Sequence, residues 1–273
     1  MESLVSSGYE IGVVVTGQDR RRGRREKPSP SPVKKVAIEM GIPVVHEIEE
    51  IENFEIDLAV VVAFGSFIPV ELLQRIQMIN VHFSLLPRWR GPAPIERAIL
   101  AGDKKSGVCV MEVGEEFDVG GVFAREEVPI LDRDSADSLR SRLIETGSKL
   151  LVSVLDKGLG EPTPQSGEVV WAEKVMPQER EIMWDLEAEA IDRLVRIGGA
   201  WTTFRGERLK IWACEPNMQE IQGQPGQLIG DQVVTGNGAL KLTEVQSQNR
   251  ARQSFESWQL GARLEKNCVF GDD

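Results

Sequence analysis

The sequence has 273 residues, of which 41% are hydrophobic and 27% charged, and its formal net charge is −11. This composition is typical of a globular protein, so it favours neither a disordered chain nor a membrane protein. The length allows one large domain with a small companion. The negative charge argues against nucleic-acid binding over the whole surface, because phosphate binding depends on concentrated Lys and Arg.

Cysteine usage and the N-terminus narrow the class of protein further. The three cysteines, Cys109, Cys214 and Cys268, are scattered and form no CxxC pair. The sequence contains only two histidines that could complete a metal site with them. We therefore expect free thiols and no bound metal. The N-terminus lacks the basic stretch, apolar stretch and cleavage site of a secretory signal, which predicts a cytoplasmic location.

The first half of the chain alternates apolar runs with amphipathic segments. Residues 11–16 and 56–65 are continuous, β-branched runs, which are typical of parallel strands buried on both faces. The segment 31–41 between them has helical spacing and ends at a glycine. Residues 77–85 predict a further strand, and a helix is expected to begin near Pro94. This alternation predicts an open, doubly wound α/β sheet.

The second half changes character. An amphipathic helix is expected over 134–157 and a shorter one over 185–197, with turn-rich sequence between them. Beyond Arg205 short strands alternate with turns, and Asn237-Gly238 is a strong hairpin signal. We predict an α/β domain over residues 1–157, a linker with a helix over 158–204, and a small β-barrel over 205–273.

Polar side chains share one face of the strand at 79–84. Alternation places Asn80, His82 and Ser84 together, on a face that would be apolar in a strand buried on both sides. A hydrogen-bonded structural histidine explains many such cases. The strand, however, runs directly into a Pro- and Gly-rich loop at its C-terminal end, where open α/β folds bind their ligands. The sequence therefore favours a functional site here.

The segment NVHFSLLPRWRGPAPIERAILAGDKKSGV, residues 80–108, resembles the signature of the methionyl-tRNA formyltransferases. The resemblance extends over nearly the whole chain from Gly8. It includes TGQDRRRGRREKPSPSPVK, VVVAFGSFIP, EEFDVGG, WTTFRGERLKIW and GALKLTEVQ. It implies a Rossmann-like formyltransferase domain followed by a C-terminal barrel of OB type. It also implies transfer of a formyl group from 10-formyltetrahydrofolate to methionyl initiator tRNA, in support of translation initiation.

The resemblance also assigns roles to residues. It implies that Asn80, His82 and Asp118 are catalytic, and the amide and imidazole are suitable donors to a developing oxyanion. It implies that a second set of residues binds the folate: Phe64, Gly65, Ile68, Ser84, Leu85, Leu86 and Pro87. No metal is expected to take part. The expected partners are folate and initiator methionyl-tRNA, with a monomeric protein and no membrane.

A basic segment, DRRRGRREK at residues 19–27, stands out in this acidic chain. Charge alone favours a solvated loop. The resemblance implies contact with tRNA phosphates for five of its cationic side chains, Arg20, Arg22, Arg24, Arg25 and Lys27.

Two alternatives stay open. One is an amino-sugar-nucleotide formyltransferase, which shares the catalytic strand but should lack the basic loop. The other is a truncated, non-catalytic relative that binds tRNA or folate.

The sequence departs from the family pattern near its start and in one later connection. The resemblance begins at the end of the family's first helix, so we expect the family's first strand to be absent and the strands at 11–16 and 77–84 to border a gap. The connection at 196–200 is also shorter than the family pattern.

Overall fold

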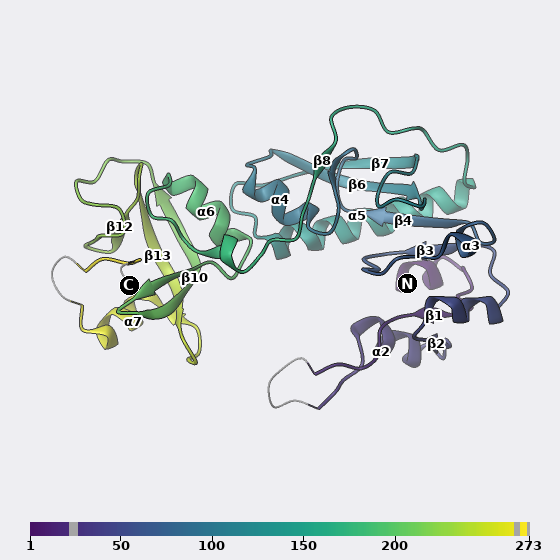
Figure 1. The fold of residues 1–273 in the computed structure, drawn as a ribbon, viewed down its shortest axis with the longest axis horizontal. Helices are drawn as coiled ribbons and strands as arrows, with labels where there is room; N and C mark the ends of the chain where they lie inside the picture. Colours follow the sequence, from purple (N-terminus) through teal and green to yellow (C-terminus); the bar gives the residue numbers. More distant parts are fainter. Residues whose placement is uncertain (22–26, 265–267, 272–273) are drawn as a thin grey trace. The chain divides into compact units, whose positions relative to one another are not determined.

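The computed structural model describes residues 1–21, 27–264 and 268–271. The chain forms two compact units (Figure 1). The N-terminal unit contains Met1–Pro92, Gly107–Glu127 and Leu143–Val170, and the C-terminal unit contains Ala93–Ser106, Val128–Arg142 and Trp171–Asp273. The functional division expected at residues 157 and 204 stays a prediction.

Two sheets form the framework of the N-terminal unit. In the first, β1 (Val14–Val15) pairs in parallel with β2 (Val44–Val45). The second has the order β3 (Ala59–Val61), β4 (Met78–His82), β6 (Lys105–Glu112) and β7 (Val122–Pro129) (Figure 1). β3 runs parallel to β4, and β6 runs antiparallel to it. The predicted α/β class is confirmed.

The break between these sheets is not where the sequence placed it. β4 pairs with β3 on one side and with β6 on the other, so the expectation that residues 77–84 border a gap is wrong. The end strands next to the break are β1 and β3. Both sheets nevertheless contribute to one apolar cluster. Its buried members are Ile51, Ile68, Leu72 and Met78, with Val13, Val15, Val45, Ala59 and Val61 packed against them. Hydrophobic packing therefore connects the two sheets, which are not joined by strand pairing.

The two apolar runs are less buried than expected. In the first run Val14 is buried, whereas its neighbours are partly or fully exposed. All of β3 is partly exposed, and Val62 directly after it is 51% exposed. The prediction of strands buried on both faces is wrong for these segments. The physical reason is that an end strand has a neighbour on one side only, so its side chains keep contact with solvent.

Short helices precede and connect these strands. They are α1 (Glu2–Ser6), α2 (Pro32–Glu39), the 3-10 helix η1 (Ile48–Asn53) and α3 (Val70–Leu73). α2 begins as predicted, because the Ser31 hydroxyl accepts a hydrogen bond from the Lys34 backbone N–H at 3.1 Å and Pro32 occupies the first position. It ends just before Gly41, whose φ of +70° is a conformation that glycine adopts at low cost.

Two further helices agree with the predictions: α4 (Pro94–Leu100) begins at the predicted position, and α5 (Ala136–Lys157) begins and ends near its predicted bounds. The Ser135 hydroxyl accepts from the Ser138 N–H at 3.1 Å and so caps α5. Gly158 follows the last residue of α5 with a φ of +79°. Among residues 1–21, 27–264 and 268–271, none of the helices combines the length and the apolar character that a bilayer span requires.

An antiparallel sheet dominates the C-terminal unit. Its order is β11 (Leu228–Ile229), β12 (Gln232–Val234), β13 (Ala239–Ser247), β10 (Glu207–Asn217) and β9 (Trp201–Phe204), and β14 (Gln253–Ser254) pairs with β13. The sheet curls into a half-barrel, which confirms the predicted OB-like architecture. The Asn237-Gly238 turn joins β12 to β13, and a Cβ on Gly238 would lie 2.5 Å from the Asn217 carbonyl. This close approach requires glycine.

Helices and aromatic rings complete this unit. The unit also contains α6 (Ala188–Arg196), α7 (Phe255–Ala262) and a short 3-10 helix, η2 (Gln178–Arg180). The rings of Trp184, Phe204, Phe255, Trp258 and Phe270 pack with centroids 5.0–6.5 Å apart. Such spacing is favourable for aromatic pairs and gives the half-barrel its core.

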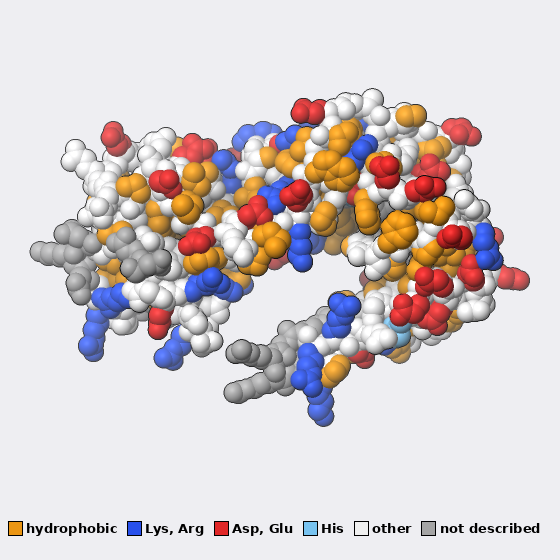
Figure 2. Space-filling model, viewed as in Figure 1, with side chains coloured by type: hydrophobic (Ala, Val, Ile, Leu, Met, Phe, Trp, Pro, Cys, Tyr) orange, Lys and Arg blue, Asp and Glu red, His pale blue; other side chains and the backbone are white. Residues whose placement is uncertain are grey.

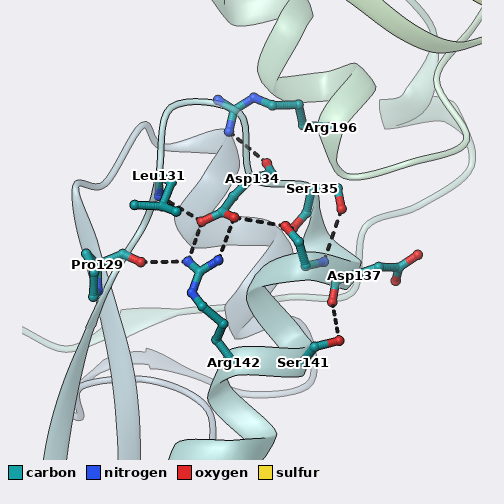
Figure 3. A network of polar contacts seen from close by, with 9 residues as sticks. Pro129, Leu131, Asp134, Ser135, Asp137, Ser141, Arg142 and Arg196 are labelled. Atoms are coloured by element: carbon teal, nitrogen blue, oxygen red, sulfur yellow. Dashed lines mark hydrogen bonds and ion pairs between the residues drawn. The ribbon is translucent and has the colours of Figure 1, made fainter.

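A buried carboxylate, Asp134, fixes the start of α5 (Figure 3). It accepts hydrogen bonds from the Leu131 N–H at 2.7 Å and from the Ser138 hydroxyl at 2.9 Å. Both terminal nitrogens of Arg142 also donate to it, and Arg196 donates to its backbone carbonyl at 3.0 Å. The Arg142 guanidinium outweighs the effect of burial and lowers the pKa of Asp134 from 3.8 to about 2.

We predict that Asp134→Asn lowers the free energy of unfolding by about 2 kcal/mol, since each unit of pKa shift corresponds to about 1.4 kcal/mol. A carboxyl group whose pKa is lowered by folding stabilises the fold fully at a pH above its pKa in the unfolded chain. This contribution is lost as the pH falls from about 4, the unfolded pKa, to about 2, the folded pKa. The variant should therefore lose stability at neutral pH and show a weaker acid dependence. Denaturant unfolding between pH 2 and pH 7 measures both.

The matched control is Asp137→Asn, in the first turn of α5, because the Asp137 side chain is 95% exposed. Exposed ion pairs contribute little, so this variant should unfold like the unmodified protein. Equal unfolding free energies for the two variants would contradict the role given to Asp134.

Candidate active site

The site is built on β4 and on the two loops next to its C-terminal end. Ile79 and Val81 point into the core, and they are 0% and 6% exposed. Asn80 and His82 alternate with them and both reach the side chain of Asp118. The structure therefore brings together the three residues predicted to be catalytic, although their catalytic role stays a proposal.

Asp118 is the centre of this group. Its Oδ1 atom lies 3.3 Å from the Asn80 Nδ2 donor and 3.4 Å from His82 Nδ1. Its Oδ2 atom accepts a 2.8 Å hydrogen bond from the Gly91 N–H. The carboxylate, 14% exposed, is thus shared by an amide, an imidazole and a backbone donor. Such hydrogen bonds compensate for the cost of removing a charge from water.

The loop that follows β4 supports the other side of the imidazole. His82 Nε2 lies 2.9 Å from the Trp89 carbonyl, and because a carbonyl can only accept, Nε2 carries a proton. Nδ1 faces the Asp118 carboxylate at 3.4 Å, so a proton taken up by this nitrogen would lie against a negative charge. Trp89 has a φ of +66°, which is uncommon for a residue other than glycine and turns its carbonyl toward the ring. Trp89 belongs to β5 (Arg88–Arg90).

The backbone of Asp118 is held by a residue that sequence reasoning missed. Gln165 Nε2 donates to the Asp118 and Gly120 carbonyls, at 2.8 Å each. Gln165 Oε1 accepts from Arg90 Nε at 3.0 Å and from Arg90 Nη2 at 2.7 Å. Gln165 lies in the turn-rich segment after α5, and a single glutamine there gives no local signal of these bonds.

Tight packing shapes the Asp118 loop. Asp118 has a φ of +56°, in the left-handed region. A Cβ on Gly120 would lie 2.0 Å from the Glu112 carbonyl, so a larger residue would push the loop away from β6. The conformation that presents the carboxylate therefore depends on glycine at one position and on external hydrogen bonds.

The residues predicted to bind folate fall into two groups. Ser84, Leu86 and Pro87 are buried, and the Ser84 hydroxyl donates to the Arg88 carbonyl at 2.7 Å. A Cβ on Gly107 would strike the Leu85 side chain, so that side chain lies against β6. Ser84 thus closes the loop after His82.

The second group follows β3. Phe64 and Ile68 pack in the apolar cluster around Met78, while Gly65 is exposed. The first group follows β4, which carries His82, and the second follows β3, which pairs with β4. Their contact with folate stays a prediction.

The basic segment is closed at its base by two backbone hydrogen bonds between Arg20 and Ser29, at 3.1 and 3.3 Å. Arg20 and Lys27 are exposed. Figure 2 shows Lys and Arg side chains on the segment around α2. Arg22, Arg24 and Arg25 lie outside the described residues, and the tRNA contact predicted for all five stays a prediction.

Cysteine and metal chemistry have little support in the described residues. Burial raises the pKa of the Cys109 thiol, and burial together with Asp192 raises the pKa of the Cys214 thiol, so both favour the unreactive neutral form. Within the described ranges there is no group of three or more His, Cys, Asp or Glu side chains that could hold a metal ion.

Comparison with known proteins extends over both units. The formyl transferase family matches residues 3–155, and the family of formyl transferase C-terminal domains matches residues 174–263. The methionyl-tRNA formyltransferase of Roseobacter denitrificans is 38% identical over 289 residues, which cover 99% of this chain and 94% of that protein.

Two solved structures share the fold. HypX from Aquifex aeolicus superposes with a TM-score of 0.63 at 20% identity, over 84% of this chain and 45% of HypX. The N-formyltransferase from Helicobacter canadensis, in complex with folinic acid and dTDP-3-aminofucose, has a TM-score of 0.62 at 15% identity, over 88% of this chain and 99% of that one. At sequence identities this low, the structural similarity shows that the fold is shared and nothing more. The family matches and the relative that is similar over nearly its whole length show that the chain belongs to the methionyl-tRNA formyltransferase family.

Proposed function

We propose that this protein transfers a formyl group from 10-formyltetrahydrofolate to the amino group of methionyl initiator tRNA, in support of translation initiation. The single observation that carries the chemistry is the Asp118 carboxylate shared by Asn80 and His82 at the C-terminal end of β4. The tRNA substrate follows from relatives that are 35–38% identical and are named methionyl-tRNA formyltransferases.

The reaction requires charge stabilisation and one proton transfer. The amine attacks the formyl carbon, a tetrahedral intermediate with an oxyanion forms, and the bond from that carbon to the folate nitrogen breaks. Asn80 donates one N–H to Asp118 and keeps a second for the oxyanion. The amine loses a proton and the folate nitrogen gains one, so a group such as His82 that both takes and gives a proton serves the step. Asp118 balances the charge of the protonated imidazole.

The remaining assignments belong to the same proposal. Phe64, Gly65, Ile68 and the segment Ser84–Pro87 bind the folate, and the basic side chains from Arg20 to Lys27 bind the tRNA. A cytoplasmic location follows from the use of charged initiator tRNA, which is consumed where translation takes place. We also propose a monomer with an α/β catalytic domain over 1–157 and a barrel over 205–273.

The direct test uses purified protein with labelled 10-formyltetrahydrofolate and two acceptors in parallel. Methionyl initiator tRNA should yield formylmethionine, and an amino-sugar nucleotide should stay unmodified. Label on the sugar alone would favour the amino-sugar alternative. Retained tRNA binding without any transfer would favour the non-catalytic alternative.

We predict that Asn80→Ala, His82→Ala and Asp118→Ala each lower kcat by about 10²–10³-fold, the loss typical of an oxyanion donor. The substrates should still bind, because the folate and tRNA contacts lie elsewhere. Steady-state formylation with both substrates saturating measures kcat, and a thermal transition near that of the unmodified protein shows that folding is intact.

The other histidine provides the control. His46 contacts the Thr16 carbonyl and Lys34 beside β2, so His46→Ala should keep kcat within about two-fold at saturating tRNA. Normal turnover by folded His82→Ala would show that the proposed site is wrong.

The basic segment generates a separate prediction. Replacing Arg22 and Arg24 with Gln should raise the KM for tRNA and flatten its salt dependence, by about 0.9 in the log–log slope for each lost duplex phosphate contact. The KM for folate should not change. Formylation rates across a series of salt concentrations give both values.

Arg75→Gln is the matched control, since Arg75 is a 63% exposed arginine that pairs with Glu52 in the same unit. Its loss removes one positive charge without touching the segment. If the Arg22/Arg24 variant keeps the salt slope of this control, the segment is a solvated loop and not a tRNA contact.

A further inference from the structure

We propose that Gln165 is a positioning residue of the formyl-transfer site, which sets the direction of the Asp118 carboxylate by holding the backbone of its loop. This inference rests on the proposed function, because it assigns a role within that reaction. A closed set of hydrogen bonds connects Gln165, Arg90 and the Asp118 loop, all within the N-terminal unit.

The segment that carries Gln165 runs beside the Asp118 loop. The Val122 N–H donates to the Thr163 carbonyl at 2.8 Å, and the Thr163 N–H donates back at 2.9 Å. Two residues later the pairing passes from backbone to side chain. Gln165 Nε2 supplies donors to the Gly120 and Asp118 carbonyls, where a strand would supply backbone N–H groups. Gln165 therefore extends the pairing up to Asp118 itself.

The other end of the same side chain reaches the loop after β4. Gln165 Oε1 accepts two hydrogen bonds from Arg90. The next residue, Gly91, donates its N–H to Asp118 Oδ2, and the residue before, Trp89, contacts His82 through its carbonyl. The amide thus closes a ring of contacts that includes both the backbone and the carboxylate of Asp118.

The hydrogen-bonding capacity of Gln165 decides between a positioning role and substrate contact. A primary amide has two N–H donors and two acceptor lone pairs. Gln165 uses both donors on carbonyls of the Asp118 loop and accepts twice from Arg90. Its amide is therefore fully occupied inside the protein, and its influence on the reaction passes through Asp118 and Arg90.

The Asp118 loop needs such support. Asp118 has a φ of +56°, which is unfavourable for a residue other than glycine and persists where surrounding contacts hold it. The carboxylate contacts Asn80 and His82 at 3.3 and 3.4 Å, so a small rotation of the loop would break them. Misplacement of a reacting group by about 1 Å can cost about 10²-fold in rate.

The test replaces the amide while keeping the size of the side chain. Gln165→Met loses all four hydrogen bonds, and Gln165→Glu keeps the acceptor for Arg90 but loses the N–H donors. We expect both to lower kcat by about 10²-fold while each KM stays within about two-fold. In the Met variant the NMR resonance of the His82 ring should also shift, and that of His46, the only other histidine, should not.

The control is Gln246→Met. Gln246 also bridges two partners, since it accepts from Trp212 Nε1 at 2.9 Å and donates to the Arg250 carbonyl at 2.7 Å, but it lies in the C-terminal unit. Its kcat should match that of the unmodified protein. If Gln165→Met fails to fold, Arg90→Met opens the ring from the other side and should show the same fall in kcat, with partial recovery in Arg90→Lys.

Normal kcat in folded Gln165→Met, or a raised KM with normal kcat, would overturn the proposal. A fall in kcat with unchanged KM and a shifted His82 resonance would support it. Failure of the unmodified protein to formylate would overturn the proposed function instead, and the His82 resonance would still report whether Gln165 controls the geometry of the site.

Discussion

The geometry of this site depends on one carboxylate. Asp118 accepts from Asn80, from the Gly91 N–H and, when the ring carries a second proton, from His82, and these partners come from a strand and from the loop that follows it. A carboxylate that is 14% exposed loses much of its hydration, and these donors replace it. The same contacts fix the amide and the ring relative to each other. One charge therefore organises both the folding of the loops and the placement of the reactive groups.

The sequence revealed the parts of this site that follow a local pattern. Asn80 and His82 could be placed on one face because side chains alternate along a strand, and the polar face indicated function because strands in such sheets are usually apolar. Asp118 had no such pattern, since an acid beside glycines is most often a turn residue. Only the family resemblance identified it. Gln165 gave no signal, because its bonds run from a side chain to carbonyls about 45 residues away along the chain.

The fold shows the same division between local and distant information. The starts of α2 and α5 and the Asn237-Gly238 turn were predictable, because capping and turn formation involve residues within three positions of each other. Strand pairing was not predictable in this way. The run at 56–65 has the composition of a central strand, yet β3 ends its sheet, since composition does not specify which strands become neighbours.

The position of the sheet break explains how the site keeps its geometry. β4 is hydrogen-bonded on both sides, through Val61↔Asn80 to β3 and through His82↔Cys109 to β6, so backbone pairing fixes the register of the face that carries Asn80 and His82. β1 and β2, next to the basic segment, connect to this sheet through the apolar cluster around Met78. Apolar contacts are not directional, whereas ladder hydrogen bonds are. The N-terminal unit thus holds the groups proposed to be catalytic by directional bonds, and it attaches the segment proposed to bind tRNA through packing that specifies orientation less strictly.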